Sequence, residues 1–325
     1  MCISGFTLAY AYRDRPINYR TFVARRAWRV ALPYLVWSGI YLIVFPPDGM
    51  NSAAGFISVI LYGTAFYHLY FVVVSVQWYV IFPFVLPLAN RLRGRAAAVA
   101  TGAVLALSLG VAAWFTAGAS LPAWASPLNR VLPHWDALLV SYLGYYLLGT
   151  LGGIHAEGVL SWLRRHLWLV AAAMAGLLGY LMLDVVQDGF AHYSESIDIF
   201  RPAMVLYGLA GSGLLLACAG QITRAGGKAY TWLLAISGNS FPIYLAHPLI
   251  LYLVESYILS QVHSYSPILS APLILVAFLV PHGLSILVKS TPLAPVLLGQ
   301  GSWRHPRRAD RVRPVWAEQL PSHGD

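Results

Sequence analysis

The sequence predicts an all-α fold: a polytopic integral membrane helix bundle with eight full spans and a partial span at the N-terminus. Two observations carry this prediction. Apolar residues make up 58% of the 325 residues and charged residues only 10%, whereas a typical soluble domain has about 25% charged residues. Long apolar runs also follow one another from residue 28 to residue 289. A soluble globular protein is therefore excluded.

The apolar runs have the length that crosses a bilayer. A span needs about 20 residues, because the hydrocarbon layer is about 30 Å thick and a helix rises about 1.5 Å per residue. Eight runs meet this requirement, at residues 28–46, 67–89, 96–117, 135–154, 167–184, 201–221, 231–255 and 268–289. A ninth run, 52–67, is shorter and interrupted by glycine, so we expect a re-entrant or interfacial helix, or part of a bent hairpin, that does not cross by itself.

The first twelve residues, MCISGFTLAYAY, are apolar and lead into a basic segment. As a helix they reach only about 18 Å, which is too short to cross. Two interpretations stay open. The segment is either an interfacial N-terminal helix or the end of a span whose beginning is missing.

The basic residues predict the orientation of the spans. Of the 21 Lys and Arg residues, all but Arg130 and Arg201 lie on alternate connections or in the flanking segments. Acidic residues favour the opposite side, where one connection holds Asp184, Asp188, Glu195 and Asp198. The positive-inside rule then places segment 10–29 and the C-terminus in the cytoplasm. The net charge of +9 follows from this topology, so no nucleic-acid partner is expected.

The chain divides into a transmembrane domain, 1–298, and a tail, 299–325. The tail is polar, basic and interrupted by proline, which predicts a disordered cytoplasmic segment. Cys2 and Cys218 both lie in apolar stretches, and no metal-ligand spacing or disulfide framework is visible. We therefore expect no metal site.

The segment SGNSFPIYLAHPLI, residues 237–250, is the most informative stretch for chemistry. Ser240, Tyr244 and His247 are spaced so that a helix places them on one face. Two prolines in the segment each remove a backbone donor, which invites kinks. The structural alternative is a kinked helix whose polar residues bond to neighbouring helices.

Two further stretches carry candidates. His68 lies near the outer end of its span, where the alternative is an ordinary aromatic belt. Arg25, Arg26 and Arg29 fall on about two helical turns, and the guanidinium fork suits phosphate oxygens. The arginines therefore indicate either a phosphate-rich ligand such as a coenzyme A thioester, or positive-inside charge in contact with anionic lipid.

Four motifs together resemble the acyltransferase 3 family of membrane acyltransferases. They are ISGFTLAY at residues 3–10, Arg26-x-x-Arg29 followed by Pro33-Tyr34, YHLYF at 67–71 and SFPIYLAHP at 240–248. Their order and spacing, with the Tyr-rich segment 142–149, extend the resemblance over residues 1–298. One position departs from the pattern, since Tyr70 stands where the family motif has Trp.

The resemblance implies a function. Such proteins usually have ten spans and transfer an acyl group, often acetyl from acetyl-CoA, to a sugar hydroxyl of a glycan. It implies an acyl-CoA donor as substrate with no bound cofactor, a carbohydrate acceptor, membrane lipids as partners and a bacterial inner membrane location. The alternatives are a transporter or flippase, which would show a repeat that is not visible here, and an inactive truncated member of the family.

The resemblance also implies roles for residues. Aligned on the Ser-Gly-Phe motif, the chain is expected to begin inside the second span and to lack the first, which in the family carries the usual base histidine. No residue here replaces that histidine by position. His68 and His247 match other motifs of the family, for which the resemblance implies acceptor-side or structural roles. Together with Tyr244 and Ser240, which we expect as oxyanion donors, they are the remaining catalytic candidates. Donor phosphates are assigned to Arg25, Arg26 and Arg29.

Overall fold

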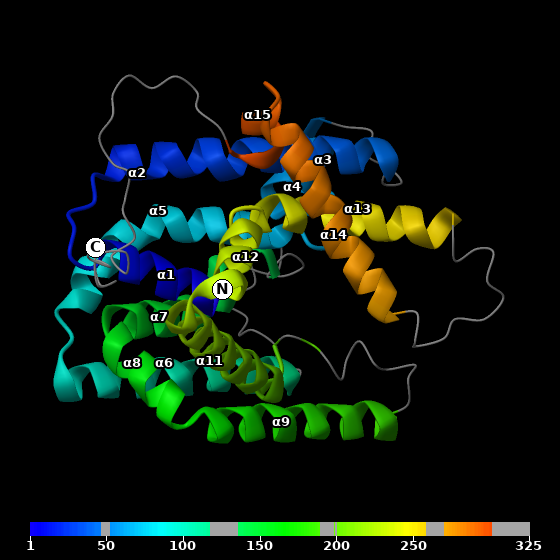
Figure 1. The fold of residues 1–325 in the computed structure, drawn as a ribbon. Helices are drawn as coiled ribbons and strands as arrows, with labels where there is room; N and C mark the ends of the chain where they lie inside the picture. The colour runs from blue at the N-terminus through cyan, green and yellow to red at the C-terminus, as the bar shows by residue number, and fades with distance from the viewer. Residues whose placement is uncertain (47–52, 118–135, 189–197, 199, 258–269, 301–325) are drawn as a thin grey trace.

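The computed structural model describes residues 1–46, 53–117, 136–188, 198, 200–257 and 270–300 (Figure 1). Arg130, Glu195 and the tail from residue 301 lie outside these residues. All regular structure in the described ranges is helical. The helices are α1 (Cys2–Tyr12), α2 (Tyr19–Arg26), the π-helix η1 (Ala27–Ala31), α3 (Leu32–Val44), α4 (Ala53–Tyr62), α5 (Tyr70–Asn90), α6 (Gly94–Thr116), α7 (Leu139–Ile154), α8 (Ala156–Arg165), α9 (Leu167–Asp188), α11 (Pro202–Ala225), α12 (Gly227–Ser237), α13 (Ser240–Tyr257), α14 (Ser270–Lys289) and α15 (Ala294–Leu298).

The multi-pass membrane helix bundle is confirmed, but the number of spans is not. Within the described residues, six helices are long and apolar enough to cross a membrane, and a seventh span results if α12 and α13, bent by 69°, count as one. The run 52–67 contains only the short helix α4, and the run 135–154 forms α7, which has 16 residues.

The short length of α7 has a local cause in α5. The amide nitrogen of Gln77 donates to the carbonyl of Ala137, and its amide oxygen accepts the N–H of Leu139, both at 2.8 Å. One side chain in the middle of α5 therefore bonds the chain on both sides of the start of α7. This polar contact lets α7 begin inside the bundle, where a free N–H would otherwise be costly.

The N-terminal helix α1 packs inside the bundle, side by side and parallel with α7. Glycines allow α1 and α7 to approach so closely that the backbones of the two helices are in contact. A Cβ added to Gly5 would lie 2.4 Å from the carbonyl oxygen of Tyr146, and one added to Gly149 would lie 2.0 Å from that of Cys2. Small residues are what allow membrane helices to approach in this way. The helix is therefore not an isolated interfacial element.

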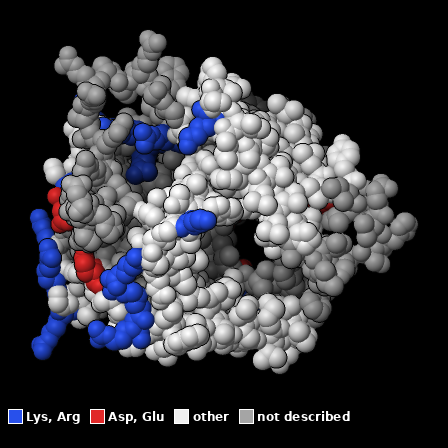
Figure 2. Space-filling view, in the orientation of Figure 1, with Lys and Arg blue, Asp and Glu red and all other residues white. Residues whose placement is uncertain are grey.

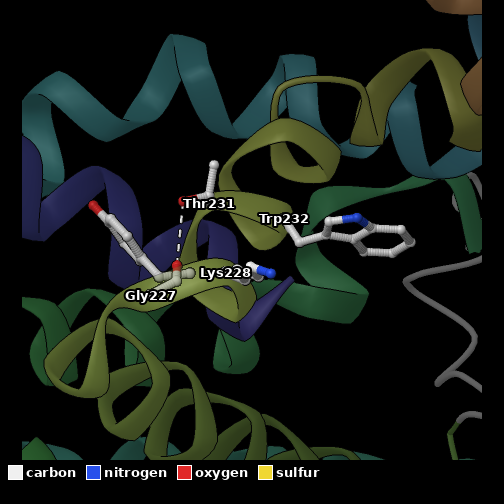
Figure 3. A pocket seen from close by; sticks show the side chains of 5 residues that line it. Gly227, Lys228, Thr231 and Trp232 are labelled. Atoms are coloured by element: carbon white, nitrogen blue, oxygen red, sulfur yellow. Dashed lines mark hydrogen bonds between the residues drawn. The ribbon is translucent and has the colours of Figure 1, made fainter.

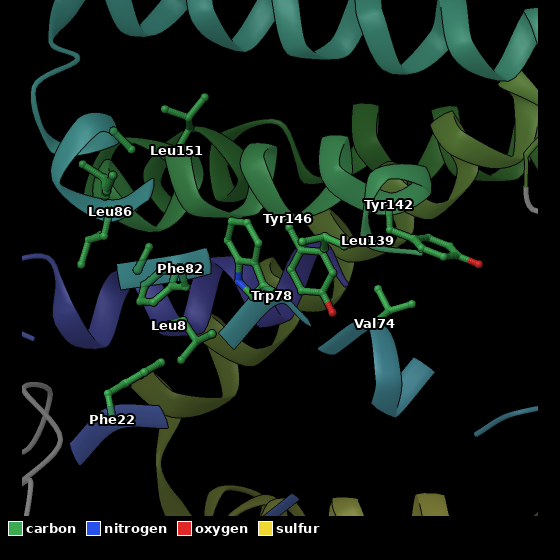
Figure 4. Packing of buried hydrophobic residues seen from close by; sticks show 13 residues of the cluster. Leu8, Phe22, Val74, Trp78, Phe82, Leu86, Leu139, Tyr142, Tyr146 and Leu151 are labelled. Carbon is green, nitrogen blue, oxygen red and sulfur yellow. The ribbon is translucent and has the colours of Figure 1, made fainter. Parts of the chain in front are cut away.

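The core around α1, α5 and α7 is aromatic (Figure 4). Trp78 and Tyr146 are both fully buried and stack with ring centroids 4.8 Å apart. The Tyr146 hydroxyl lies 3.1 Å from the hydroxyl of Ser75. Phe22 of α2 stacks on Phe82 of α5 at 5.9 Å, which joins the basic segment to the same core.

Charged side chains gather at one end of the bundle (Figure 2). At this basic end the Arg13 guanidinium, after α1, donates to both carboxylate oxygens of Glu157 in α8, at 2.9 and 2.5 Å. This hydrogen bonding lowers the pKa of Glu157. The amide of Asn90, at the end of α5, donates to the carbonyl of Arg13 at 2.9 Å. At the opposite end Arg201 pairs with Asp184 across α9 and α11.

Candidate functional site

The arginine segment runs into α3 through a π-helical turn. Pro33 has no N–H to give to the carbonyl of Arg29, four residues earlier, so the regular ladder is interrupted here. Leu32 instead donates to Ala27, five residues earlier, which is the bond of a π-turn. Such turns are frequent at functional sites.

A cavity of about 300 Å³ lies beside this turn. Arg26 lines it from the end of α2, Arg29 from the π-turn, Ser75 and Phe71 from α5, and Ser240 from the first turn of α13. We call it the arginine cavity. The arginine cavity brings the arginine segment together with the start of α13, which lies more than 200 residues later in the sequence.

The arginine cavity favours an anion. Two guanidinium groups line it, and none of its described lining residues is acidic. The first N–H groups of α13 have no partner within the helix, and the helix dipole makes this end partly positive. Arg26 is held in place by Tyr79, whose ring centroid is 5.1 Å from the guanidinium carbon. Arg25 is exposed and does not line the cavity.

The end of the described chain closes one side of this cavity. Gly299 has φ +64°, and a Cβ there would lie 2.0 Å from the carbonyl oxygen of Arg29. The Gln300 amide donates to the carbonyl of Gly238, four residues before Pro242, which has no N–H to offer. Sequence reasoning missed Gly299 and Gln300, because their role depends on a contact with distant backbone.

The predicted residues of α13 meet His68 deeper in the bundle. The His68 ring centroid is 5.1 Å from that of Tyr244 and 5.4 Å from that of His247. The Tyr244 hydroxyl donates to the His68 carbonyl. We call these three residues the histidine cluster. Phe71 links it to the arginine cavity, since its ring centroid is 5.4 Å from that of Tyr244.

The imidazole ring of His68 is buried, and its two nitrogens have no hydrogen-bond partner among the described residues. Only 7% of the residue is exposed. Its ring neighbours include Tyr41 and Phe66, at 5.4 and 5.9 Å. Burying an unpaired polar group costs about 1–3 kcal/mol, so this residue is not explained by packing alone.

The hydrogen bond of His247 fixes its tautomer. Pro248 cannot donate to the Tyr244 carbonyl, four residues earlier. The Nδ1 of His247 lies 2.8 Å from that carbonyl oxygen, and because a carbonyl only accepts, Nδ1 carries the proton. The other ring nitrogen, Nε2, then holds the lone pair that a general base needs.

The hydroxyls of the two predicted oxyanion donors both donate to backbone carbonyls in this structure. Ser240 donates to the Ser237 carbonyl at 3.0 Å, and Tyr244 donates to that of His68. Ser240 also lines the arginine cavity, one helical turn before Tyr244. The shared face predicted for the α13 residues thus connects the cavity with the histidine cluster.

A larger, open hollow of about 510 Å³ lies along α12 (Figure 3). Its lining includes Lys228, Tyr230 and Trp232, and Trp232 is 65% exposed. The hydroxyl of Thr231 is used within the helix, at 3.2 Å from the Gly227 carbonyl. A lysine beside an exposed tryptophan is typical of the interface between membrane and water, and nothing in the described lining of this hollow points to catalysis.

A comparison with protein families gives the arrangement a context. A family model described as an acyltransferase domain matches residues 1–282. The chain belongs to the acyltransferase 3 family. The match runs from α1 through the arginine cavity and the histidine cluster into α14, and it does not favour a transporter or flippase. No curated protein and no solved structure matches the chain. This acyltransferase 3 member is therefore a multi-pass membrane acyltransferase by family.

Proposed function

We propose that this chain transfers an acyl group from an acyl-CoA, such as acetyl-CoA, to a hydroxyl of an extracytoplasmic or lipid-linked glycan. One observation carries the proposal. Arg26 and Arg29 line a cavity whose inner wall, Phe71, contacts the histidine cluster. A cavity suited to an anion and the His247 imidazole thus lie near the same Phe71 side chain, and this neighbourhood supports transfer from a phosphorylated thioester.

The donor would bind with its phosphates at Arg26, Arg29 and the N-terminus of α13. Phosphate oxygens accept well from guanidinium groups and from the free N–H groups of a helix start. From Ser240 to His247 the helix rises about 10 Å. The extended arm of coenzyme A can cover this distance, which would bring the thioester past Phe71 to the histidine cluster.

His247 would act as the general base. Its Nε2 takes the proton from the acceptor hydroxyl, while the hydroxyl oxygen attacks the thioester carbonyl. The carbon–sulfur bond then breaks, an ester forms, and the leaving thiolate takes the proton back from the imidazolium. The bond from Nδ1 to the Tyr244 carbonyl keeps the proton on Nδ1 throughout, so Nε2 is the nitrogen that takes and returns the proton.

The donor site is tested by the paired change Arg26→Gln with Arg29→Gln. We expect the affinity for acetyl-CoA to fall at least about 100-fold, because each of the two lost hydrogen bonds to a charged group is worth about 1.5–3 kcal/mol. Calorimetry on the purified full chain measures this. The matched control is Arg25→Gln, which removes an exposed charge of the same segment and should change affinity less than twofold. Equal losses in both variants would mean that general charge binds the donor, and the assignment would be wrong.

A further inference from the structure

A hollow separate from the arginine cavity lies beside His247, on the side of α13 that faces α14. It is an apolar groove of about 440 Å³. From α13 it is lined by Ile243, His247 and Leu251, which recur every four residues and so form one stripe. From α14 it is lined by apolar side chains that include Ile274 and Phe278. Among these lining residues, His247 alone is polar.

The groove has an edge on the apolar outer surface of two spans. Helix α14 crosses α13 obliquely (Figure 1), and the groove lies between side chains of these two helices. Ile274 is 67% exposed at this edge, and its neighbour Leu275 is 58% exposed but lies outside the groove. Apolar side chains exposed on a span face hydrocarbon, and a ligand can therefore enter sideways from the bilayer.

The His247 imidazole indicates which chemical group such a ligand must carry, namely a hydrogen-bond donor. Within the described residues the hydrogen bond of the His247 ring is the one from Nδ1 to the Tyr244 carbonyl, so Nε2 remains an acceptor at a groove whose other lining residues are apolar. His68, the histidine whose ring lies beside it, is not its partner, since neither His68 ring nitrogen bonds to any described residue. An unpaired acceptor in hydrocarbon is costly. A lipid tail cannot donate to it, whereas a hydroxyl group can.

We infer that the acceptor is an amphiphile, a sugar carried on a hydrocarbon chain, which reaches the site from the bilayer through this groove. The chain lies along the Ile243–Leu251 stripe and against α14, and one sugar hydroxyl donates to Nε2 of His247. The inference rests on the proposed function and specifies the acceptor class for it. A water-soluble glycan would gain nothing from an apolar entrance.

The test uses an alkyl glucoside with a photoactivatable diazirine in its alkyl chain, mixed with the purified full chain in lipid nanodiscs. We expect crosslinks on α13 and α14 that unlabelled alkyl glucoside suppresses and that free glucose does not. The variant Ile274→Trp, which fills the groove, should reduce this crosslinking at least fivefold. The matched control Leu275→Trp places the same bulk on the same helix outside the groove and should leave it within twofold of the original.

Two results would overturn the inference. One is crosslinking that Ile274→Trp does not reduce. The other is competition by an alkane without a sugar that equals competition by the glucoside, because the groove would then hold ordinary lipid. Binding of acetyl-CoA to the same nanodiscs separates this failure from failure of the proposed function. If acetyl-CoA binding depends on Arg26 and Arg29 while Ile274→Trp leaves glucoside crosslinking unchanged, the proposed donor site is supported and the proposed acceptor route is wrong.

Discussion

In the histidine cluster, the ring contacts of His68 explain its position but not the presence of two polar nitrogens. His68 has aromatic neighbours on several sides and no polar partner in the described chain. A Phe at this position would keep the ring contacts and remove the cost of two buried nitrogens. Packing within the described chain therefore leaves the two ring nitrogens of His68 unaccounted for.

This argument predicts opposite effects of His68→Phe on stability and on activity. The melting temperature of the purified protein should rise, by the equivalent of about 1 kcal/mol, since an unpaired polar group leaves the interior. Acyl transfer should fall at least tenfold. Tyr67→Phe is the control, because Tyr67 is exposed and should change neither. A lower melting temperature with unchanged transfer would show that His68 is structural.

At the scale of helices, three prolines shape the site by leaving a carbonyl unpaired four residues earlier. Pro33 frees the Arg29 carbonyl, against which Gly299 packs. Pro242 likewise frees the Gly238 carbonyl, which accepts a hydrogen bond from Gln300. Pro248 frees the Tyr244 carbonyl for His247. Each proline thus leaves one backbone carbonyl free of its helical hydrogen bond, and a side chain or a distant segment contacts that carbonyl instead.

The contact of α1 with α7 is tested by Gly149→Ala. The added Cβ would lie 2.0 Å from the Cys2 carbonyl oxygen, and because backbone cannot rotate aside, the two helices must separate. Overpacking of this kind costs about 1–3 kcal/mol, so we expect a clear fall in melting temperature in detergent. Gly176→Ala in α9 is the matched control, since nothing lies within 4 Å of its added Cβ. An unchanged melting temperature for Gly149→Ala would contradict the parallel packing of α1 on α7.

For the whole molecule, the sequence predicts what depends on composition and misses what depends on contacts. Run length was sufficient to predict most of the spans, because the bilayer fixes the length of an apolar helix. It failed for α7, whose start is determined by Gln77 on another helix. Likewise, the sequence predicts Arg25, Arg26 and Arg29 together as phosphate ligands, and only the fold shows that Arg26 and Arg29 line the arginine cavity while Arg25 does not. The groove beside His247 could not be foreseen, since it arises between two helices.

The orientation of the bundle links these parts, because coenzyme A thioesters are cytoplasmic and the arginine cavity must open there. The clustering of basic residues predicts that Arg93, between α5 and α6, is cytoplasmic and that Asp198, before α11, is outside. Both residues are exposed. In a background with Cys2 and Cys218 replaced by alanine, a membrane-impermeant maleimide should label Asp198→Cys in intact cells and Arg93→Cys only after permeabilisation. The reverse pattern would place Arg26 and Arg29 outside, where no acyl-CoA reaches them, and the proposed donor site would fall with the predicted topology.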